Sequence, residues 1–157
     1  MAAGLLVSSA AFAGGSKGSL GVGVNLPLAG GSLPSIGVQF DGGQFHVGGA
    51  FGAQNPDGGD NGSVDIMGDF YFHVASTAMS DFGLGGNVVI NMDRLGDPTD
   101  NNTTNIFLEP GFQIRAFLAS NVAIHLTAGL SIGVGDSKDF FLGGDPVGAA
   151  GFYYYFE

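Results

Sequence analysis

The chain has 157 residues, among them 30 glycines and 14 phenylalanines, with no cysteine and no tryptophan, and its length fits one domain. Fourteen acidic residues against four lysines and arginines give a formal net charge of −10, so we expect no nucleic-acid partner, because the chain lacks the cations that neutralise phosphates. No apolar run reaches the roughly 18 residues of a membrane-spanning helix, so any membrane crossing would have to use strands.

The first thirteen residues have the pattern of a secretory leader. Residues 2–13 form an apolar stretch that ends in Ala11-Phe12-Ala13, the small-x-small pattern of a cleavage site. No lysine or arginine precedes this stretch, so a start further upstream or a short buried helix stay as alternatives. We predict a signal peptide over 1–13 and a single β-barrel domain over 14–157.

From residue 18 onward, apolar residues alternate with small or polar ones in eight segments separated by turns. A period of two indicates β-strands with one apolar and one polar face. Several segments reach about a dozen residues. That exceeds the ~5–6 residues of an ordinary strand and suits a tilted strand that crosses a bilayer, which needs roughly 9–11. The predicted strands cover 18–28, 33–40, 44–53, 64–74, 82–92, 106–118, 122–134 and 147–156.

The connections between these segments alternate in length. Short links are expected over 41–43, 75–81 and 119–121, and longer polar links over 54–63, 93–105 and 135–146. This alternation is typical of an up-and-down barrel, which has turns at one rim and loops at the other. The link over 29–32 is short where a long one is expected. The sequence predicts an all-β, eight-stranded antiparallel up-and-down transmembrane β-barrel. A soluble barrel with Leu, Ile and Phe inside is the alternative.

The inward positions of these strands are polar or glycine. Eight strands leave an interior that side chains can fill, so we expect a closed lumen. If Leu118 pairs with Val122, the register sets Arg115 opposite His125. A buried arginine needs a carboxylate, for which we predict Glu109 or Asp69, and we expect cationic groups near one rim with anionic groups above them. The predicted polar network of the lumen is Arg115, Glu109, His125, Asp69, His73, His46, Asp65 and Gln113.

The leader-like start, the eight alternating segments and the aromatic last strand resemble the small eight-stranded outer-membrane barrels of Gram-negative bacteria, the OmpA-transmembrane, OmpX and OmpW-like folds. The resemblance implies a location in the bacterial outer membrane, contact with outer-membrane lipid and lipopolysaccharide, and a monomer. It also implies that the barrel assembly machinery reads the last strand through Phe152, Tyr154 and Phe156, although Glu157 follows the last Phe.

Three kinds of function remain open. The leading one is a structural or surface-interaction barrel, and the second is a narrow channel for small solutes. The third is a lipid-modifying enzyme, because His125-Leu126-Thr127 resembles the His-x-Ser pair of barrel lipid A deacylases, with Asp139 or Asp145 as the carboxylate. The alternation turns this pair into the lumen, away from lipid, so we expect no enzyme.

The acidic loops are the candidate metal site. Asp57 and Asp60 lie in one long loop, and Asp97 and Asp100 in the next. Oxygen-rich loops of this kind can bind Ca²⁺ weakly, but the spacing of an EF-hand is absent. Aspartate, asparagine and glycine also serve turns for backbone reasons, which explains the loops equally well. We expect no other cofactor.

Overall fold

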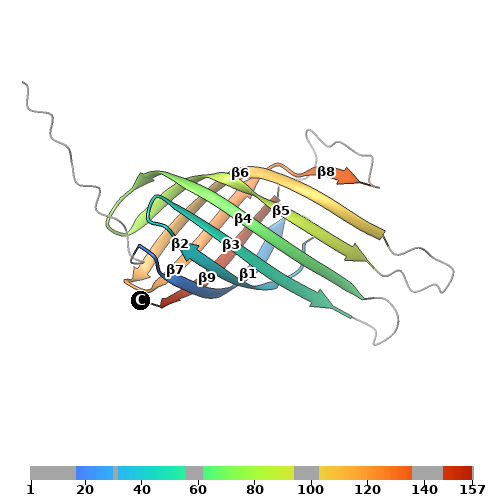
Figure 1. Ribbon diagram of the computed structural model, residues 1–157, viewed down its shortest axis with the longest axis horizontal. Helices are drawn as coiled ribbons and strands as arrows, with labels where there is room; N and C mark the ends of the chain where they lie inside the picture. Colours follow the sequence, from blue (N-terminus) through green and yellow to red (C-terminus); the bar gives the residue numbers. More distant parts are fainter. Residues whose placement is uncertain (1–16, 30–31, 56–61, 94–102, 136–146, 157) are drawn as a thin grey trace, which may run out of the picture.

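The computed structural model describes residues 17–29, 32–55, 62–93, 103–135 and 147–156, which form one closed antiparallel sheet (Figure 1). The order around the sheet is β5-β4-β3-β2-β1-β9-β7-β6-β8, and the pairing of β5 with β6 closes it. Closure leaves no free sheet edge along the barrel body. The strands are β1 (Leu20–Ala29), β2 (Ser35–Asp41), β3 (Phe45–Gln54), β4 (Ser63–Ser76), β5 (Ser80–Asp93), β6 (Thr103–Ala119), β7 (Val122–Gly129), β8 (Ile132–Gly135) and β9 (Val147–Phe156).

The described residues contain no helix long and apolar enough to cross a membrane. The predicted leader over 1–13 lies outside the described residues, and so do Asp139, Asp145 and Glu157. The same holds for the four loop aspartates proposed for Ca²⁺, namely Asp57, Asp60, Asp97 and Asp100.

The seventh predicted strand is interrupted, which gives nine strand segments in a barrel of eight strands. β7 ends at Gly129 and β8 begins at Ile132, yet both pair with β6 in one continuous register. The break lies opposite Pro110, which has no N–H to donate, although its carbonyl accepts a 3.1 Å bond from the Leu130 N–H. The unbroken strand predicted over 122–134 was therefore wrong, whereas the eight-stranded antiparallel barrel is confirmed.

Strand pairing brings one end of every strand to a common rim. Leu20 pairs with both Phe40 and Phe156, so the start of β1, the β2–β3 turn and the end of β9 lie together. The β4–β5 and β6–β7 turns lie at the same end, which we name the short-turn rim. The opposite end, where the 32–34 link lies, is the loop rim.

The β4–β5 turn is tighter than predicted, the β2–β3 turn is shifted by one residue, and the aspartates beside both turns belong to strands. β2 extends to Asp41, and β5 begins at Ser80, so only residues 77–79 separate β4 from β5. The turn predicted over 75–81 was therefore too long. Because the inward alternation continues into these extensions, Asp41 and Asp81 are buried, at 1% and 4% exposure.

The β6–β7 turn contains a bulge. Ala119 pairs with Val122, so the predicted pairing of Leu118 with Val122 was wrong. Leu118 is the extra residue of this bulge and has no partner on β7. Beyond the bulge the register is as predicted, with Arg115 opposite His125.

The two faces of the barrel have opposite polarity. Large apolar side chains point outward, and Ile36 and Leu28 are 72% and 68% exposed. The soluble alternative with Leu, Ile and Phe inside is contradicted, because the polar residues are the buried ones. Every strand of the eight exposes at least one large apolar side chain, for example Val22, Val38, Val47, Phe70, Leu84, Leu108, Leu126 and Phe152.

Inward glycines make room for aromatic rings inside the barrel. Tyr71, Tyr153 and Tyr155 are each about 1% exposed. A Cβ on Gly21 would lie 2.8 Å from Cε1 of Tyr155, and a Cβ on Gly37 would overlap the hydroxyl of Tyr153. Tyrosine rings on some strands therefore occupy the volume that glycines on others leave empty.

We predict that Gly85→Ala destabilises the barrel by about 1–3 kcal/mol, because the added methyl would overlap the carbonyl oxygen of Phe70 on the paired strand. The matched control is Gly68→Ala, whose Cβ would point into open space with nothing within 4 Å. Urea unfolding of the refolded protein measures both. Equal unfolding midpoints for the two variants would contradict the close approach of β4 and β5.

Candidate functional site

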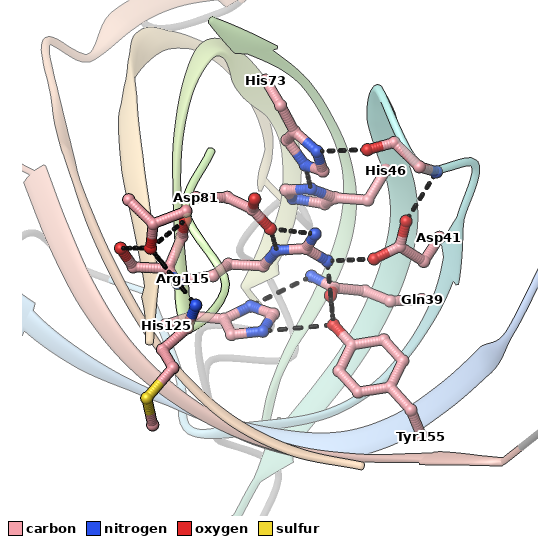
Figure 2. A network of polar contacts seen from close by, with 12 residues as sticks. Gln39, Asp41, His46, His73, Asp81, Arg115, His125 and Tyr155 are labelled. Carbon is pink, nitrogen blue, oxygen red and sulfur yellow. Dashed lines mark hydrogen bonds and ion pairs between the residues drawn. The ribbon is translucent and has the colours of Figure 1, made fainter. Parts of the chain in front are cut away.

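Arg115 lies on the inner face of β6 and is 2% exposed. Its Nη1 lies 2.7 Å from Oδ2 of Asp41, and its Nη2 lies 2.6 Å from Oδ2 of Asp81. The Nε–H also donates to Oδ2 of Asp81, at 3.2 Å. Figure 2 shows the guanidinium between the two carboxylates. We name these three residues the Arg115 cluster.

The two carboxylates reach Arg115 from different directions. Asp81 is its direct cross-strand neighbour on β5, whereas Asp41 comes from β2, which does not pair with β6. Asp41 is held in turn by the N–H of Gly43, which donates to Oδ1 at 2.7 Å. The Arg115 cluster therefore spans the lumen near the short-turn rim.

The predicted partners of Arg115 were wrong. Neither Glu109 nor Asp69 forms its ion pair, because Asp41 and Asp81, which were assigned to turns, lie closer. The sequence did contain the signal. The alternation in the second strand turns Gln39 inward, and the same alternation continued by two residues turns Asp41 inward.

Neutral groups complete the shell of the guanidinium. The hydroxyl of Tyr155 donates to Oε1 of Gln39 at 2.8 Å and accepts a 3.4 Å bond from Nη1 of Arg115. The Gln39 amide lies 3.4 Å from Nδ1 of His125, and Nε2 of His125 lies 3.2 Å from the Tyr155 oxygen. The ring of Phe117 lies 5.2 Å from the guanidinium carbon. Polar contacts and a cation–π contact thus enclose the charge.

A second group of polar side chains lies beside the Arg115 cluster (Figure 2). The imidazole nitrogens His46 Nδ1 and His73 Nε2 are 2.8 Å apart, and Nδ1 of His73 lies 2.9 Å from the carbonyl oxygen of Gly43. On its other side, His46 Nε2 lies 3.9 Å from Oδ1 of Asp69. This row runs from the short-turn rim toward the middle of the lumen.

Carboxylates with neutral partners occupy the half of the lumen nearer the loop rim. Glu109 accepts bonds from the amide of Asn87 at 3.2 Å and the hydroxyl of Ser131 at 3.5 Å. Asp65 accepts bonds from the N–H of Leu33 at 2.6 Å and the amide of Asn91 at 2.7 Å.

The predicted sorting of charge by height was wrong in part. Anionic groups do lie nearer the loop rim than Arg115, but the layer that contains Arg115 also contains Asp41 and Asp81. Gln113, the remaining predicted member, is 4% exposed, and its Oε1 has no hydrogen-bond partner among the described residues.

A cavity of about 40 Å³ lies in the half of the lumen nearer the loop rim. Apolar side chains from the loop rim, such as Leu33, Met67 and Val147, form part of its wall, and Tyr71 and Glu109 also line it. Its volume exceeds the ~10–15 Å³ that one water needs, so it has room for a few waters but not for a large ligand.

The geometry of the His125–Thr127 pair is not that of a base and its nucleophile. The Thr127 hydroxyl donates to the carbonyl oxygen of Ala149 at 3.2 Å, while His125 contacts Gln39 and Tyr155. Within the described ranges, no three His, Asp or Glu residues gather in an arrangement that could hold a metal ion.

The fold is that of the OmpA-like small barrels, a closed sheet of eight antiparallel strands, as the resemblance predicted. A similar solved structure is the crystal structure of the N-terminal β-barrel domain of OprF from Pseudomonas aeruginosa. It superposes with a TM-score of 0.60 at 8% sequence identity, over 89% of this chain and 98% of that chain. No protein-family model and no curated protein sequence matches the chain.

We predict that Arg115→Met lowers the free energy of unfolding by about 3–5 kcal/mol, because it leaves two buried carboxylates without their counter-charge. Denaturant titration of the refolded protein measures the change. Adding Asp41→Asn and Asp81→Asn to the same chain removes the unpaired charges and should recover most of the loss. An Arg115→Met variant with the wild-type midpoint would contradict this account of the Arg115 cluster.

Proposed function

We propose that this protein is an integral barrel of the bacterial outer membrane with a closed lumen and a structural or surface-interaction role. The observation that carries the proposal is the inverted polarity of the sheet, with apolar side chains exposed around the whole circumference and charged ones buried. An apolar surface of this extent is unfavourable in water and favourable in lipid.

The outer face also carries aromatic residues where a membrane interface would lie. Phe40, Phe72, Tyr154 and Phe156 are all exposed close to the short-turn rim. Girdles of aromatic residues at the height of the lipid headgroups are typical of outer-membrane barrels. The strand lengths of 10 to 17 residues for β1, β3, β4, β5, β6 and β9 support the same placement.

The Arg115 cluster supports the proposal of a closed lumen. Its side chains reach across the barrel from β2, β5 and β6, and buried tyrosines fill the adjoining space. A channel for small solutes is the second candidate function, and the cavity in the half of the lumen nearer the loop rim favours it. Solute passage would require Arg115 to leave both of its carboxylates at once, which is costly for a buried charge.

The proposed partners follow from the two faces and the rims. Outer-membrane lipid would contact the apolar band, and the loop rim would meet lipopolysaccharide or another surface partner. The barrel assembly machinery would read the outward residues of β9, which are Phe152, Tyr154 and Phe156. All three are exposed on the same face of the last strand, which supports this proposal. We propose a monomer without enzymatic activity.

Planar-bilayer recordings should show no stable conductance steps when the refolded protein is added, because the Arg115 cluster blocks hydrated ions. Before recording, insertion is checked by faster migration of the unheated protein in detergent gels. Regular ohmic steps would favour the channel, and a protein that stays monomeric and soluble without detergent would contradict the membrane placement.

We predict that Val88→Arg lowers the free energy of unfolding in lipid vesicles by about 2–4 kcal/mol, since Val88 points outward near the middle of β5. The control is Gln44→Arg in the β2–β3 turn, because Gln44 is exposed there and the added charge would stay in water. Urea unfolding in vesicles compares the two variants. Equal stability would show that residue 88 does not face hydrocarbon.

A further inference from the structure

Glu109 is a buried carboxylate without a positive partner in the described part of the chain. It lies on the inner face of β6, is 9% exposed and lines the cavity near the loop rim. None of the ion pairs among the described residues includes it. Arg115 lies further along the same strand, at about 20 Å for ~3.3 Å per residue, and is already matched within its own cluster. A buried charge left unpaired is costly, so Glu109 needs a proton or a cation from outside.

The hydrogen bonds around Glu109 favour the ionised carboxylate. The Tyr71 hydroxyl donates to Oδ1 of Asn87 at 3.0 Å, and the Asn87 amide donates to Oε2 of Glu109 at 3.2 Å. The Ser131 hydroxyl donates to Oε1 at 3.5 Å. Every bond of this series donates in the direction of the carboxylate, which stabilises its negative charge. An ionised carboxylate has about four lone-pair sites, so both oxygens can accept again.

The cavity provides space beside this carboxylate and a route from outside. Its volume of about 40 Å³ corresponds to about three waters, because one water needs ~10–15 Å³. Met67 and Val147 in its wall are partly exposed, whereas Tyr71, which lies further from the loop rim, is 1% exposed. Within the described ranges, the cavity therefore opens toward the loop rim and ends above the Arg115 cluster.

The geometry points to this cavity as a binding site for a short primary alkylammonium ion. The ammonium group donates to the Glu109 carboxylate and to the second lone pair of Asn87 Oδ1. The alkyl group, about two carbons long in a space of three waters, lies against Leu33, Met67 and Val147. This inference goes beyond the proposed membrane barrel and does not depend on it, because binding requires only the folded lumen.

An ammonium ion suits this cavity better than a metal ion does. Ca²⁺ takes about six to eight oxygen ligands, whereas Glu109 is the one carboxylate in the described wall of the cavity. Nor do the described residues contain three His, Asp or Glu grouped to hold a metal. An ammonium group has three donors, which match the two oxygens of Glu109 and Oδ1 of Asn87. Its alkyl group also gains from leaving water for the apolar wall.

The test uses the full chain refolded in a non-ionic detergent and titrated with ethylammonium chloride at constant ionic strength. The side-chain amide of Asn87 reports binding by NMR, because it donates to Glu109. We expect a saturable shift with a dissociation constant on the order of millimolar, since a ligand of about three non-hydrogen atoms has little more to gain. Ethanol, a neutral molecule of the same size, should bind roughly tenfold more weakly because it brings no charge.

Two variants and a matched control locate the site. Glu109→Gln should weaken ethylammonium binding roughly tenfold, because the amide still accepts from Asn87 but carries no charge. Ala149→Leu should weaken it to a similar extent by filling the cavity, which Ala149 lines. Asp93→Asn is the control and should keep the wild-type affinity. It removes one negative charge at the end of β5, outside the described wall of the cavity.

Each outcome has one meaning. The absence of a saturable shift, or equal affinities of the wild type and Glu109→Gln, would overturn the site. Equal affinities for ethanol and ethylammonium would show an apolar cavity without a preference for cations, and a saturable shift with sodium chloride alone would assign the carboxylate to a metal ion. Either result would overturn the alkylammonium site. If Glu109→Gln does not refold, Ala149→Leu decides, because unchanged binding there would place the ligand outside the cavity. None of these results depends on membrane insertion, so the proposed function is tested separately.

Discussion

The burial of one guanidinium inside a barrel of eight strands is the constraint on which the rest of the lumen depends. A charge removed from water costs several kcal/mol unless it is fully paired. Arg115 meets this requirement with one carboxylate from its neighbouring strand and one from across the lumen. The hydroxyl of Tyr155 and the ring of Phe117 complete its surroundings. The inward glycines follow from the same requirement, because large rings and an arginine must share a narrow interior.

Most of the fold could be predicted from the sequence because a strand has a strict period of two. That period gave eight strands, their inward and outward faces, and the pairing of Arg115 with His125 across β6 and β7. The errors lie where the period gives no information. The bulge at the β6–β7 turn and the break opposite Pro110 change hydrogen bonds without changing which face a side chain occupies.

The partners of Arg115 could be predicted only in part. Extending the alternation by one step would have turned Asp81 inward, and strand pairing would then have placed it beside Arg115. No pairing rule places Asp41 there, since β2 and β6 are not neighbours in the sheet. Contacts across a lumen depend on barrel diameter, strand tilt and side-chain length, and these follow from the closed structure as a whole.

The cross-lumen contact between Asp41 and Arg115 has a consequence for the order of assembly. Asp81 and Arg115 belong to consecutive strands, so their pair can form as soon as that hairpin forms. Asp41 reaches Arg115 only when the sheet has curled far enough to bring β2 opposite β6, and contacts distant in sequence form late. Until then, water in the unfinished barrel hydrates Asp41 and the side of the guanidinium that Asp41 will contact. Expulsion of that water, and commitment to the closed form, coincides with the arrival of a single carboxylate.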